Sequence, residues 1–281
     1  MNASLAKTIP APSLAERLSD PKVRKRIKIN MARLALFMTF MIIWQLSAGT
    51  LISTFFISRP TDIFAVLYRW LIDGTLFFHA SITATEALSG FVIGSLAGIA
   101  MGTVLGRWQA AADLLEPFIM AFYSLPKVAL APLFVMWLGI GMTMKIVLTA
   151  AVVFFLVFLN TYTGVRSVSR ELVVIMKLMG AKESHVLTKV VIPSALTWVF
   201  AGLRISVPYA LIGAIVGELI ASNRGLGYLL SSSAGQFDTA GVFAALGSVI
   251  VLAALLNFAV KKLETKLAPW KSAELSREMT V

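Results

Sequence analysis

The run MKIVLTAAVVFFLVFLNTYTGV, residues 144–165, decides the fold class, because one lysine is its only charged residue. As a helix it would rise about 33 Å at ~1.5 Å per residue, enough to cross ~30 Å of hydrocarbon. Further apolar runs of similar length lie at 34–57, 81–105, 114–138, 194–220 and 239–260. The sequence therefore predicts an all-α polytopic membrane protein with six transmembrane helices.

The composition of the 281-residue chain agrees with a membrane protein and excludes several kinds of site. Hydrophobic residues make up 58% and charged residues 14%, against roughly 45–50% and about 25% in soluble domains. The chain has no cysteine, which excludes disulfides, cysteine-ligated metals and thiol nucleophiles. Its two histidines, His79 and His185, are far apart in sequence, so we predict no metal site and no catalytic residue.

The basic residues indicate the orientation of the chain. Most of the 25 lysines and arginines lie in the first 33 residues, near Arg107, in the connection 166–193, and after residue 260. Cytoplasmic segments of membrane proteins carry such an excess. We therefore predict that both termini are cytoplasmic, with a basic tail at 1–33, a six-span domain at 34–262 and a C-terminal tail at 263–281. The net charge of +11 then reflects topology, and nucleic acid is not expected as a partner.

Two stretches are expected on the outer surface. Residues 58–80 begin with a helix-start pattern and continue as a short amphipathic segment, which we expect to lie along the membrane surface. The turn-rich loop from Ser222 to Gly227 either contacts an external protein or is a solvated connection.

Glycine recurs at every fourth position of the second predicted span. The repeat leaves one face of the helix without side chains, so another helix can pack very close to it. We expect static helix packing there and keep a moving gate as the alternative. The glycines are Gly90, Gly94, Gly98, Gly102 and Gly106.

The third and fifth predicted spans carry residues that are unusual within a membrane. Pro117, Pro126 and Pro132 interrupt the third span, and irregular backbone at membrane depth is tolerated only inside protein or beside a water-filled cavity. A charge at mid-span costs ~2.5–3.5 kcal/mol on insertion scales, so Lys127 should face a pathway or pair with a carboxylate such as Glu218.

Arg204 and Glu218 both lie in the fifth span, which we expect to start after Pro193. They are about 21 Å apart along a helix, so each needs another partner. We expect the translocation pathway to be lined by Pro126, Lys127, Arg204 and Glu218.

The connection 166–193 alternates short apolar pieces with charges. Gly180 separates two short helical pieces, Glu171–Met179 and 182–191, as a glycine at a helix C-terminus does. Such a pair makes a protrusion suited to a groove in another protein. A surface hairpin at the lipid interface is the alternative.

At this connection the sequence resembles the permease subunits of ATP-binding-cassette importers. Their cytoplasmic loop reads E-A-A, three residues, Gly, nine residues, Ile, one residue, Leu-Pro; here Gly180, Val190 and Ile192-Pro193 match. Val174-Ile175-Met176 replace E-A-A, and Glu171, one turn earlier, is the candidate substitute for the missing glutamate. The likeness continues through residues 123–141, 160–168 and 216–229. These stretches resemble the branch of these permeases that transports nitrate, sulfonates, taurine and related substrates.

The resemblance implies a six-helix permease of the cell inner membrane that binds no cofactor and catalyses no reaction. Its expected partners are a second permease copy, an extracytoplasmic binding protein that delivers a small solute, and a separate ATP-binding subunit. The solute could be an anion such as a sulfonate or nitrate. The chain contains no Gly-Lys dipeptide, so it lacks the phosphate-binding loop G-x-x-x-x-G-K-[ST]. The ATPase contact is expected at Glu171, Gly180, Ala181, Lys182, Glu183, His185 and Pro193.

Two other functions are compatible with a six-span chain. An ion-driven secondary transporter would need paired broken helices in two related halves, and only one span is broken by proline. An intramembrane enzyme would need a reactive cluster at one depth, and Glu86, Glu218 and His79 do not make a convincing one.

Overall fold

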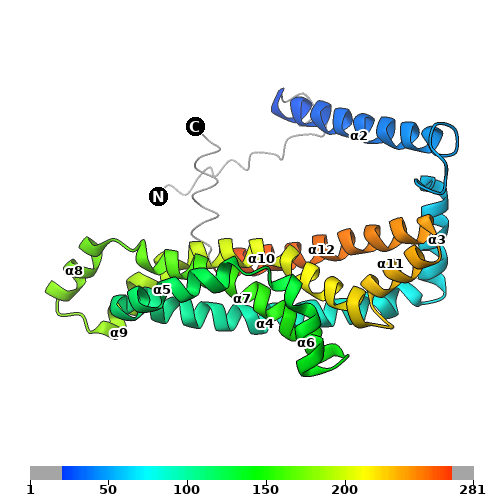
Figure 1. The fold of residues 1–281 in the computed structure, drawn as a ribbon. Helices are drawn as coiled ribbons and strands as arrows, with labels where there is room; N and C mark the ends of the chain where they lie inside the picture. The colour runs from blue at the N-terminus through cyan, green and yellow to red at the C-terminus, as the bar shows by residue number, and fades with distance from the viewer. Residues whose placement is uncertain (1–20, 268–281) are drawn as a thin grey trace, which may run out of the picture. The chain divides into compact units, whose positions relative to one another are not determined.

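The computed structural model describes residues 21–267, which are helical almost throughout (Figure 1). Residues 1–20 and 268–281, most of the two predicted tails, lie outside the described residues. The elements in chain order are α2 (Pro21–Ser47), α3 (Pro60–Ile72), α4 (Thr75–Arg107), α5 (Gln109–Ser124), the 3-10 helix η1 (Lys127–Leu130), α6 (Ala131–Leu138), α7 (Met142–Arg166), α8 (Arg170–Leu178), α9 (Glu183–Val186), the π-helix η2 (Leu187–Val191), α10 (Ile192–Ala221), α11 (Leu226–Gly235) and α12 (Thr239–Leu267).

The described helices include five that are long and apolar enough to cross a membrane, and a sixth span if the bent pair of α5 with η1–α6 is counted as one. The five lie at Val23–Ser47, Thr75–Arg107, Met142–Arg166, Glu183–Ala221 and Thr239–Lys266. The predicted all-α membrane fold is confirmed, with the third span broken.

The chain divides into two compact units, residues 1–62 and 63–281. In the first unit, the predicted span 34–57 is displaced, because α2 already ends at Ser47. Gly49 follows with φ +88°, and the turn is closed by hydrogen bonds from Trp44 Nε1 to the Ser58 carbonyl (3.1 Å) and from Arg59 Nε to the Ala48 carbonyl (3.2 Å). The helix also starts earlier than expected, since lysine and arginine are good helix formers.

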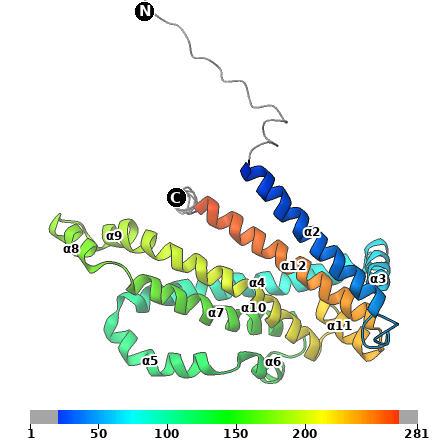
Figure 2. The ribbon, with the colours of Figure 1, turned by 90° about the horizontal axis from the view of Figure 1, so that it is seen from above.

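In the second unit, α4 and α7 run in the same direction and pack along their length (Figure 2). All five glycines that recur at every fourth position of α4 face α7. A Cβ added at Gly90 would lie 2.5 Å from Thr149 Cβ, and one at Gly94 would lie 2.5 Å from the Ala150 carbonyl oxygen. The two backbones therefore approach more closely than any side chain at these positions would allow.

The remaining helices of this unit complete the core around α7 and α4. α10 packs antiparallel to α7, with Gly202 against Asn160 and Gly217 against Lys145. α12 packs against α10 and α4, and α11 packs against α12. Valine, leucine and phenylalanine side chains from α7 and α10 fill the interface between these two helices.

Only one of the three prolines in the third span breaks it. Pro117 lies inside α5, and Pro132 lies in the first turn of α6, where proline is tolerated. The break falls at Leu125 and Pro126, whose backbone is extended or irregular, and the two helical parts are bent by 76°. The prediction of three interruptions was therefore wrong at Pro117 and Pro132.

The segment 58–80 is divided between two helices: the expected short amphipathic segment is α3, and its position along the membrane surface stays a prediction. α3 ends at Ile72, and Gly74 turns the chain with φ +79°. α4 starts directly afterwards at Thr75, six residues before residue 81, the predicted start of that span. The polar residues at its beginning are buried against α11, which the sequence pattern did not show.

Candidate functional site

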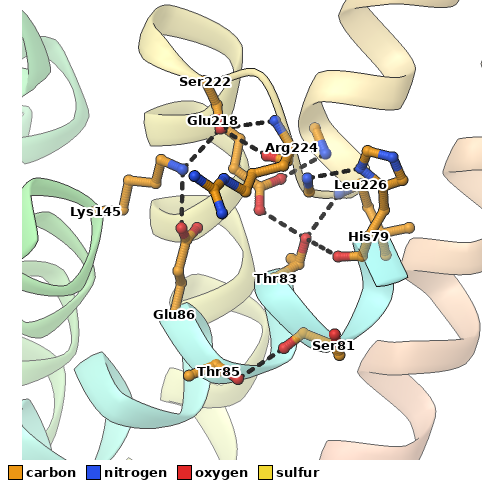
Figure 3. A network of polar contacts seen from close by, with 12 residues as sticks. His79, Ser81, Thr83, Thr85, Glu86, Lys145, Glu218, Ser222, Arg224 and Leu226 are labelled. Atoms are coloured by element: carbon orange, nitrogen blue, oxygen red, sulfur yellow. Dashed lines mark hydrogen bonds and ion pairs between the residues drawn. The ribbon is translucent and has the colours of Figure 1, made fainter. Parts of the chain in front are cut away.

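The second unit has two ends: the α11 end contains α11 and the start of α4, and the α8–α9 end contains α8, α9 and the end of α4 (Figure 1). At the α11 end, buried polar side chains hold the first turn of α11 (Figure 3). Three successive backbone N–H groups donate to them: Gly225 to His79 Nδ1 (2.9 Å), Leu226 to Thr83 Oγ1 (2.8 Å) and Gly227 to Glu218 Oε2 (2.6 Å).

These contacts satisfy N–H groups that a helix start leaves without intrahelical partners. Because Nδ1 of His79 accepts, a neutral imidazole here carries its proton on Nε2. Thr83 donates its hydroxyl to Glu218 Oε1 at 2.7 Å. A carboxylate at the positive end of a helix is electrostatically favourable, so Glu218 is well suited to cap α11.

Glycine is required twice where the chain turns over Glu218. A Cβ at Gly225 would overlap the Glu218 carboxylate, and Gly225 also has φ +106°. A Cβ at Gly227 would lie 2.8 Å from Glu218 Oε2. The R-G-L-G segment and the glutamate seven residues before its first glycine are therefore parts of one structure.

A buried ion pair lies beside this network. Lys145 of α7 donates to Glu86 Oε1 of α4 at 2.8 Å and to Ser222 Oγ, after α10, at 2.8 Å. The Glu86 and Lys145 side chains are 1% and 4% exposed. Removing one partner of such a pair typically costs ~3–5 kcal/mol, because the other charge stays buried. The pair joins α4 and α7 to the end of α10.

The four predicted pathway residues are not brought together. Glu218 belongs to the α11 network, whereas Arg204 pairs with Glu264 of α12. Lys127 lies at the break after Pro126, and its Nζ donates to the carbonyls of Tyr123 (2.7 Å) and Leu125 (3.3 Å).

Lys127 Nζ also lies 4.4 Å from the ring centroid of Phe155. Carbonyls freed by the helix break and an aromatic face thus stabilise the ammonium group. The alternative pairing of Lys127 with Glu218 was wrong.

The sequence interpretation missed Thr83 and Lys145 and gave His79 and Glu86 no role. A usable signal exists on α4: His79, Thr83 and Glu86 precede Gly90 at helical spacing and continue the face that carries the glycines. Among the described residues, no group of three or more acidic or histidine side chains could hold a metal ion. Thr83 and Glu218 bond to each other, and His79, Thr83 and Glu218 all bond to backbone N–H groups at the start of α11.

At the α8–α9 end, Gly180 terminates α8 in a Schellman motif. Its φ is +79°, the Gly180 N–H donates to the Lys177 carbonyl (2.9 Å), and the Ala181 N–H donates to the Met176 carbonyl (3.0 Å). Ala181 and Met176 pack against the same cluster of buried valines. Ser169 caps the start of α8 by accepting from the Leu172 N–H.

Glu183 joins three elements at this end. Its carboxylate lies 2.6 Å from Arg107 at the end of α4 and 2.6 Å from Lys177 of α8. The Glu183 side chain is 61% exposed, so each ion pair contributes little on its own. Together with the valine cluster, the pairs fix the orientation of the helix pair.

The second helical piece of the predicted loop is not separate from the fifth span. α9 continues through η2 into α10, so the helix runs without interruption past Pro193. The Ile192 N–H bonds to the Leu187 carbonyl in a wide π-turn, which lets the helix accept a proline instead of ending there. The prediction that the span starts after Pro193 was wrong.

Most apolar side chains of α8 are left uncovered, apart from Val173 and Met176, which pack on the valine cluster. Leu178 is 82% and Met179 is 79% exposed, and three more residues of α8 are about half exposed: Leu172, Val174 and Ile175. α8 protrudes from the end of the bundle in both views (Figures 1 and 2). An apolar helix surface outside the spans is typical of a protein contact.

Long apolar helices, one broken span and a protruding helix pair at one end define a polytopic membrane protein with an exposed helix pair outside its spans. The chain belongs to the family of binding-protein-dependent transport system inner membrane components, whose model matches residues 90–269. It is therefore a multi-pass inner-membrane permease subunit of an ABC importer for a small solute. The family consists of transport permeases rather than enzymes.

Several relatives match over nearly their whole length. The formylaminopyrimidine transport permease protein ThiX of Halalkalibacterium halodurans is 33% identical over 85% of this chain and 95% of its own. The putative aliphatic sulfonates transport permease protein SsuC of Bacillus subtilis is 30% identical over 97% of this chain and 99% of its own. The taurine transport system permease protein TauC of Escherichia coli is 29% identical over 88% of this chain and 90% of its own.

Solved structures share the fold at low sequence identity. The inward-facing MetNI methionine ABC transporter matches with a TM-score of 0.55 and 19% identity, over 69% of this chain and 94% of that one. An amino acid ABC transporter with histidines matches with a TM-score of 0.53 and 14% identity, over 72% of this chain and 97% of that one.

Proposed function

We propose that this permease works with a second copy of itself and is driven by separate ATP-hydrolysing subunits that dock on α8 and α9. In this proposal the α8–α9 end is cytoplasmic and the α11 end faces outward, where an extracytoplasmic binding protein delivers the solute. ATP binds to the partner subunits, because this chain lacks a phosphate-binding loop. Closure of the ATPases on ATP would move the docked helices and open the pathway alternately to the two sides.

The uncovered apolar surface of α8 carries the proposal. Leu178 and Met179 directly precede Gly180 and are among the most exposed large hydrophobic residues of the described chain. Glu171 lies in the first turn of α8, while Lys182 and His185 are exposed around the same protrusion. An apolar centre with a charged rim is the usual anatomy of a protein interface.

The distribution of charge supports the orientation. Six basic residues of the sequence belong to the α8–α9 end, among them Arg170 at the start of α8, as the positive-inside rule expects of a cytoplasmic face. The others are Arg107, Arg166, Lys177, Lys182 and Lys189. On this orientation, the 30-residue helix α10 connects the ATPase contact directly to Glu218 and the outer network.

The solute and its path are proposed from the chemistry of the third span. Lys127 sits at the break of that span, where its ammonium group is only partly buried and faces aromatic rings. In this proposal Lys127 and Pro126 contact a solute that passes between paired permeases. The relatives named for sulfonates and taurine support a solute with a sulfonate group, whereas ThiX is named for a formylaminopyrimidine.

Photo-crosslinking tests the docking surface directly. A benzoylphenylalanine placed at Leu178 should, on irradiation of cells, yield an adduct with a protein that contains G-x-x-x-x-G-K-[ST]. The same group at Ser231, exposed on α11, is the control and should yield no such adduct. An ATPase adduct at residue 231, or only lipid adducts at residue 178, would contradict the proposal.

A further inference from the structure

Two buried carboxyl groups meet at the α11 end. Glu86 of α4 and Glu218 of α10 are each 1% exposed, and Oε2 of Glu86 contacts the Glu218 carboxyl group. Figure 3 shows both side chains in one polar network with Lys145 and Thr83. Two ionised carboxylates in contact repel each other, and burial removes the water that would screen them. The contact therefore requires a compensating positive charge or a proton.

Among the described residues, Lys145 is the buried cation that lies beside the two carboxyl groups. Its Nζ is 2.8 Å from Oε1 of Glu86. Arg224 is exposed in the loop before α11 and forms no ion pair with either carboxyl group within residues 21–267. An exposed charge is screened by water and compensates a buried charge poorly. Two ionised carboxylates would therefore leave one uncompensated negative charge inside the protein.

The hydrogen bonds of the pair also indicate a proton. Both oxygens of Glu218 accept, one from the Thr83 hydroxyl and one from the Gly227 N–H. Oε1 of Glu86 accepts from Lys145. Oε2 of Glu86 is buried, and no N–H or O–H group of the described residues donates to it, although buried carboxyl oxygens are normally hydrogen-bonded. A proton between Oε2 of Glu86 and the Glu218 carboxyl group supplies this bond.

We propose that Glu86 and Glu218 bind one proton between them and so form a proton-binding site in each permease chain. The bound proton joins α4 to α10, and the pair then carries a single negative charge. That charge faces Lys145 on one side and the first turn of α11 on the other, where the helix dipole favours it. Carboxyl groups that share a site retain one proton in the same way in aspartic proteases. The site depends neither on the orientation of the chain nor on the ATPase contact.

The pair is shielded from water while this end of the bundle is closed. A cavity of about 660 Å³ lies next to it, lined by Glu86, Lys145 and Arg224 among others. Glu218 does not line this cavity, and Oε2 of Glu86 is buried. Separation of α4 from α10 would open the pair to the cavity, and the proton would pass to water there. Closure would take up a proton again.

Glu86→Gln is the variant that isolates the shared proton. The amide keeps an oxygen for Lys145 and places an N–H group against Glu218, so the contact is preserved without a titrating proton. The other titratable and charged side chains of the described residues that face this network remain in place. They are His79 of α4, Lys145 of α7, Arg224 of the loop before α11, and Tyr228 of α11, which stacks on His79. Their titration therefore cancels when the variant is compared with the wild type.

Nuclear magnetic resonance of the full-length permease in maltoside micelles, with isotope-labelled glutamate carboxyl carbons, detects the proton directly. The chain has nine glutamates, and glutamates in water are ionised at about pH 7. We expect the signals of the pair to add up to one protonated and one ionised carboxyl group at this pH. Glu86→Gln should remove the protonated signal, and Glu116→Gln, at an exposed position of α5, should retain it. Ionised signals alone in the wild type, or an unchanged protonated signal in Glu86→Gln, would overturn the proposal.

The pH dependence of stability counts the same proton independently. Above about pH 5 the glutamates of the unfolded chain hold almost no proton, whereas the folded pair holds one, so rising pH favours unfolding. Between about pH 5 and 7, the folding equilibrium constant of the wild type should fall about tenfold per pH unit relative to that of Glu86→Gln. It is measured in mixed micelles of dodecyl maltoside and dodecyl sulfate. Equal pH dependence of the two proteins would overturn the proposal. If Glu86→Gln does not fold, the wild-type carboxyl signals still decide between one bound proton and none.

Discussion

Gly180 and Gly225 each adopt a backbone conformation with positive φ, but they do so for different local reasons. At Gly180 a Cβ would meet nothing within 4 Å, so only the backbone conformation excludes other residues. At Gly225 the Glu218 carboxylate occupies the space as well. We therefore expect replacement of Gly180 to affect docking of the ATPase subunit and replacement of Gly225 to affect the stability of the permease.

Replacement of Gly180 should impair docking without preventing membrane insertion. Gly180→Val disfavours the positive φ by ~1 kcal/mol or more and should tilt α8 relative to α9. We expect at least a severalfold loss of co-purified ATPase subunit, or of solute-stimulated ATP hydrolysis in vesicles. Gly180→Asn, a side chain that tolerates this conformation, is the control and should retain most of both. Equal co-purification and equal stimulated hydrolysis in wild type and Gly180→Val would mean that this loop does not contact the ATPase subunit.

Replacement of Gly225 should instead destabilise the permease. Gly225→Ala forces the Glu218 carboxylate to move, and a buried polar group that loses its partners costs ~1–3 kcal/mol. We expect a Tm lower by several degrees for the purified protein, followed by tryptophan fluorescence. Gly235→Ala, in the same helix with open space around it, should change the Tm little. Identical melting of both variants would mean that α11 is not held by Glu218.

At the scale of elements, the pairing of α4 with α7 depends on the glycine face. Gly94→Ala would place a Cβ 2.5 Å from the Ala150 carbonyl oxygen of α7, where backbone has to move. We expect a reduced yield of monodisperse protein in fluorescence-detected size-exclusion chromatography. Gly247→Ala in α12 meets nothing within 4 Å and should leave the yield unchanged. A normal elution profile for Gly94→Ala would show that close packing is not required there.

Sequence patterns predicted elements well where the determining contacts are local. The spans near α4, α7 and α12, the turn at Gly180 and the glycine face all follow from periodicity or from turn chemistry. Pro193 misled the interpretation, because a proline normally ends a helix and only the π-turn of η2 allows the helix to continue. The end of α2 was misplaced because the apolar run continues through the turn at Gly49.

The site at the α11 end could be predicted only in part. Glu218 was identified because a carboxylate within a span needs a partner. Its partnership with Thr83 crosses 135 positions, and the contact of His79 with Gly225 crosses 146, so no local pattern contains them. Lys145 was overlooked since it lies at the start of an apolar run, where a single lysine is common at the membrane surface.

At the scale of the whole molecule, the second unit carries different chemistry at its two ends. The α8–α9 end presents exposed apolar residues and basic charge, while the α11 end presents buried polar groups beside an open cavity. α10 belongs to both ends, since it continues from α9 and carries Glu218 near its last residue. A movement imposed on α9 would therefore reach the polar network at the α11 end through one continuous helix.

The central claim is that solute transport by this permease is driven by ATP hydrolysis on a separate subunit. The most direct test is uptake of the solute retained by the cognate binding protein into vesicles that contain the permease, with or without the ATPase subunit. We predict uptake only when the ATPase subunit and ATP are present on the side of α8 and α9. Uptake driven by an imposed ion gradient in vesicles without the ATPase subunit would contradict the account.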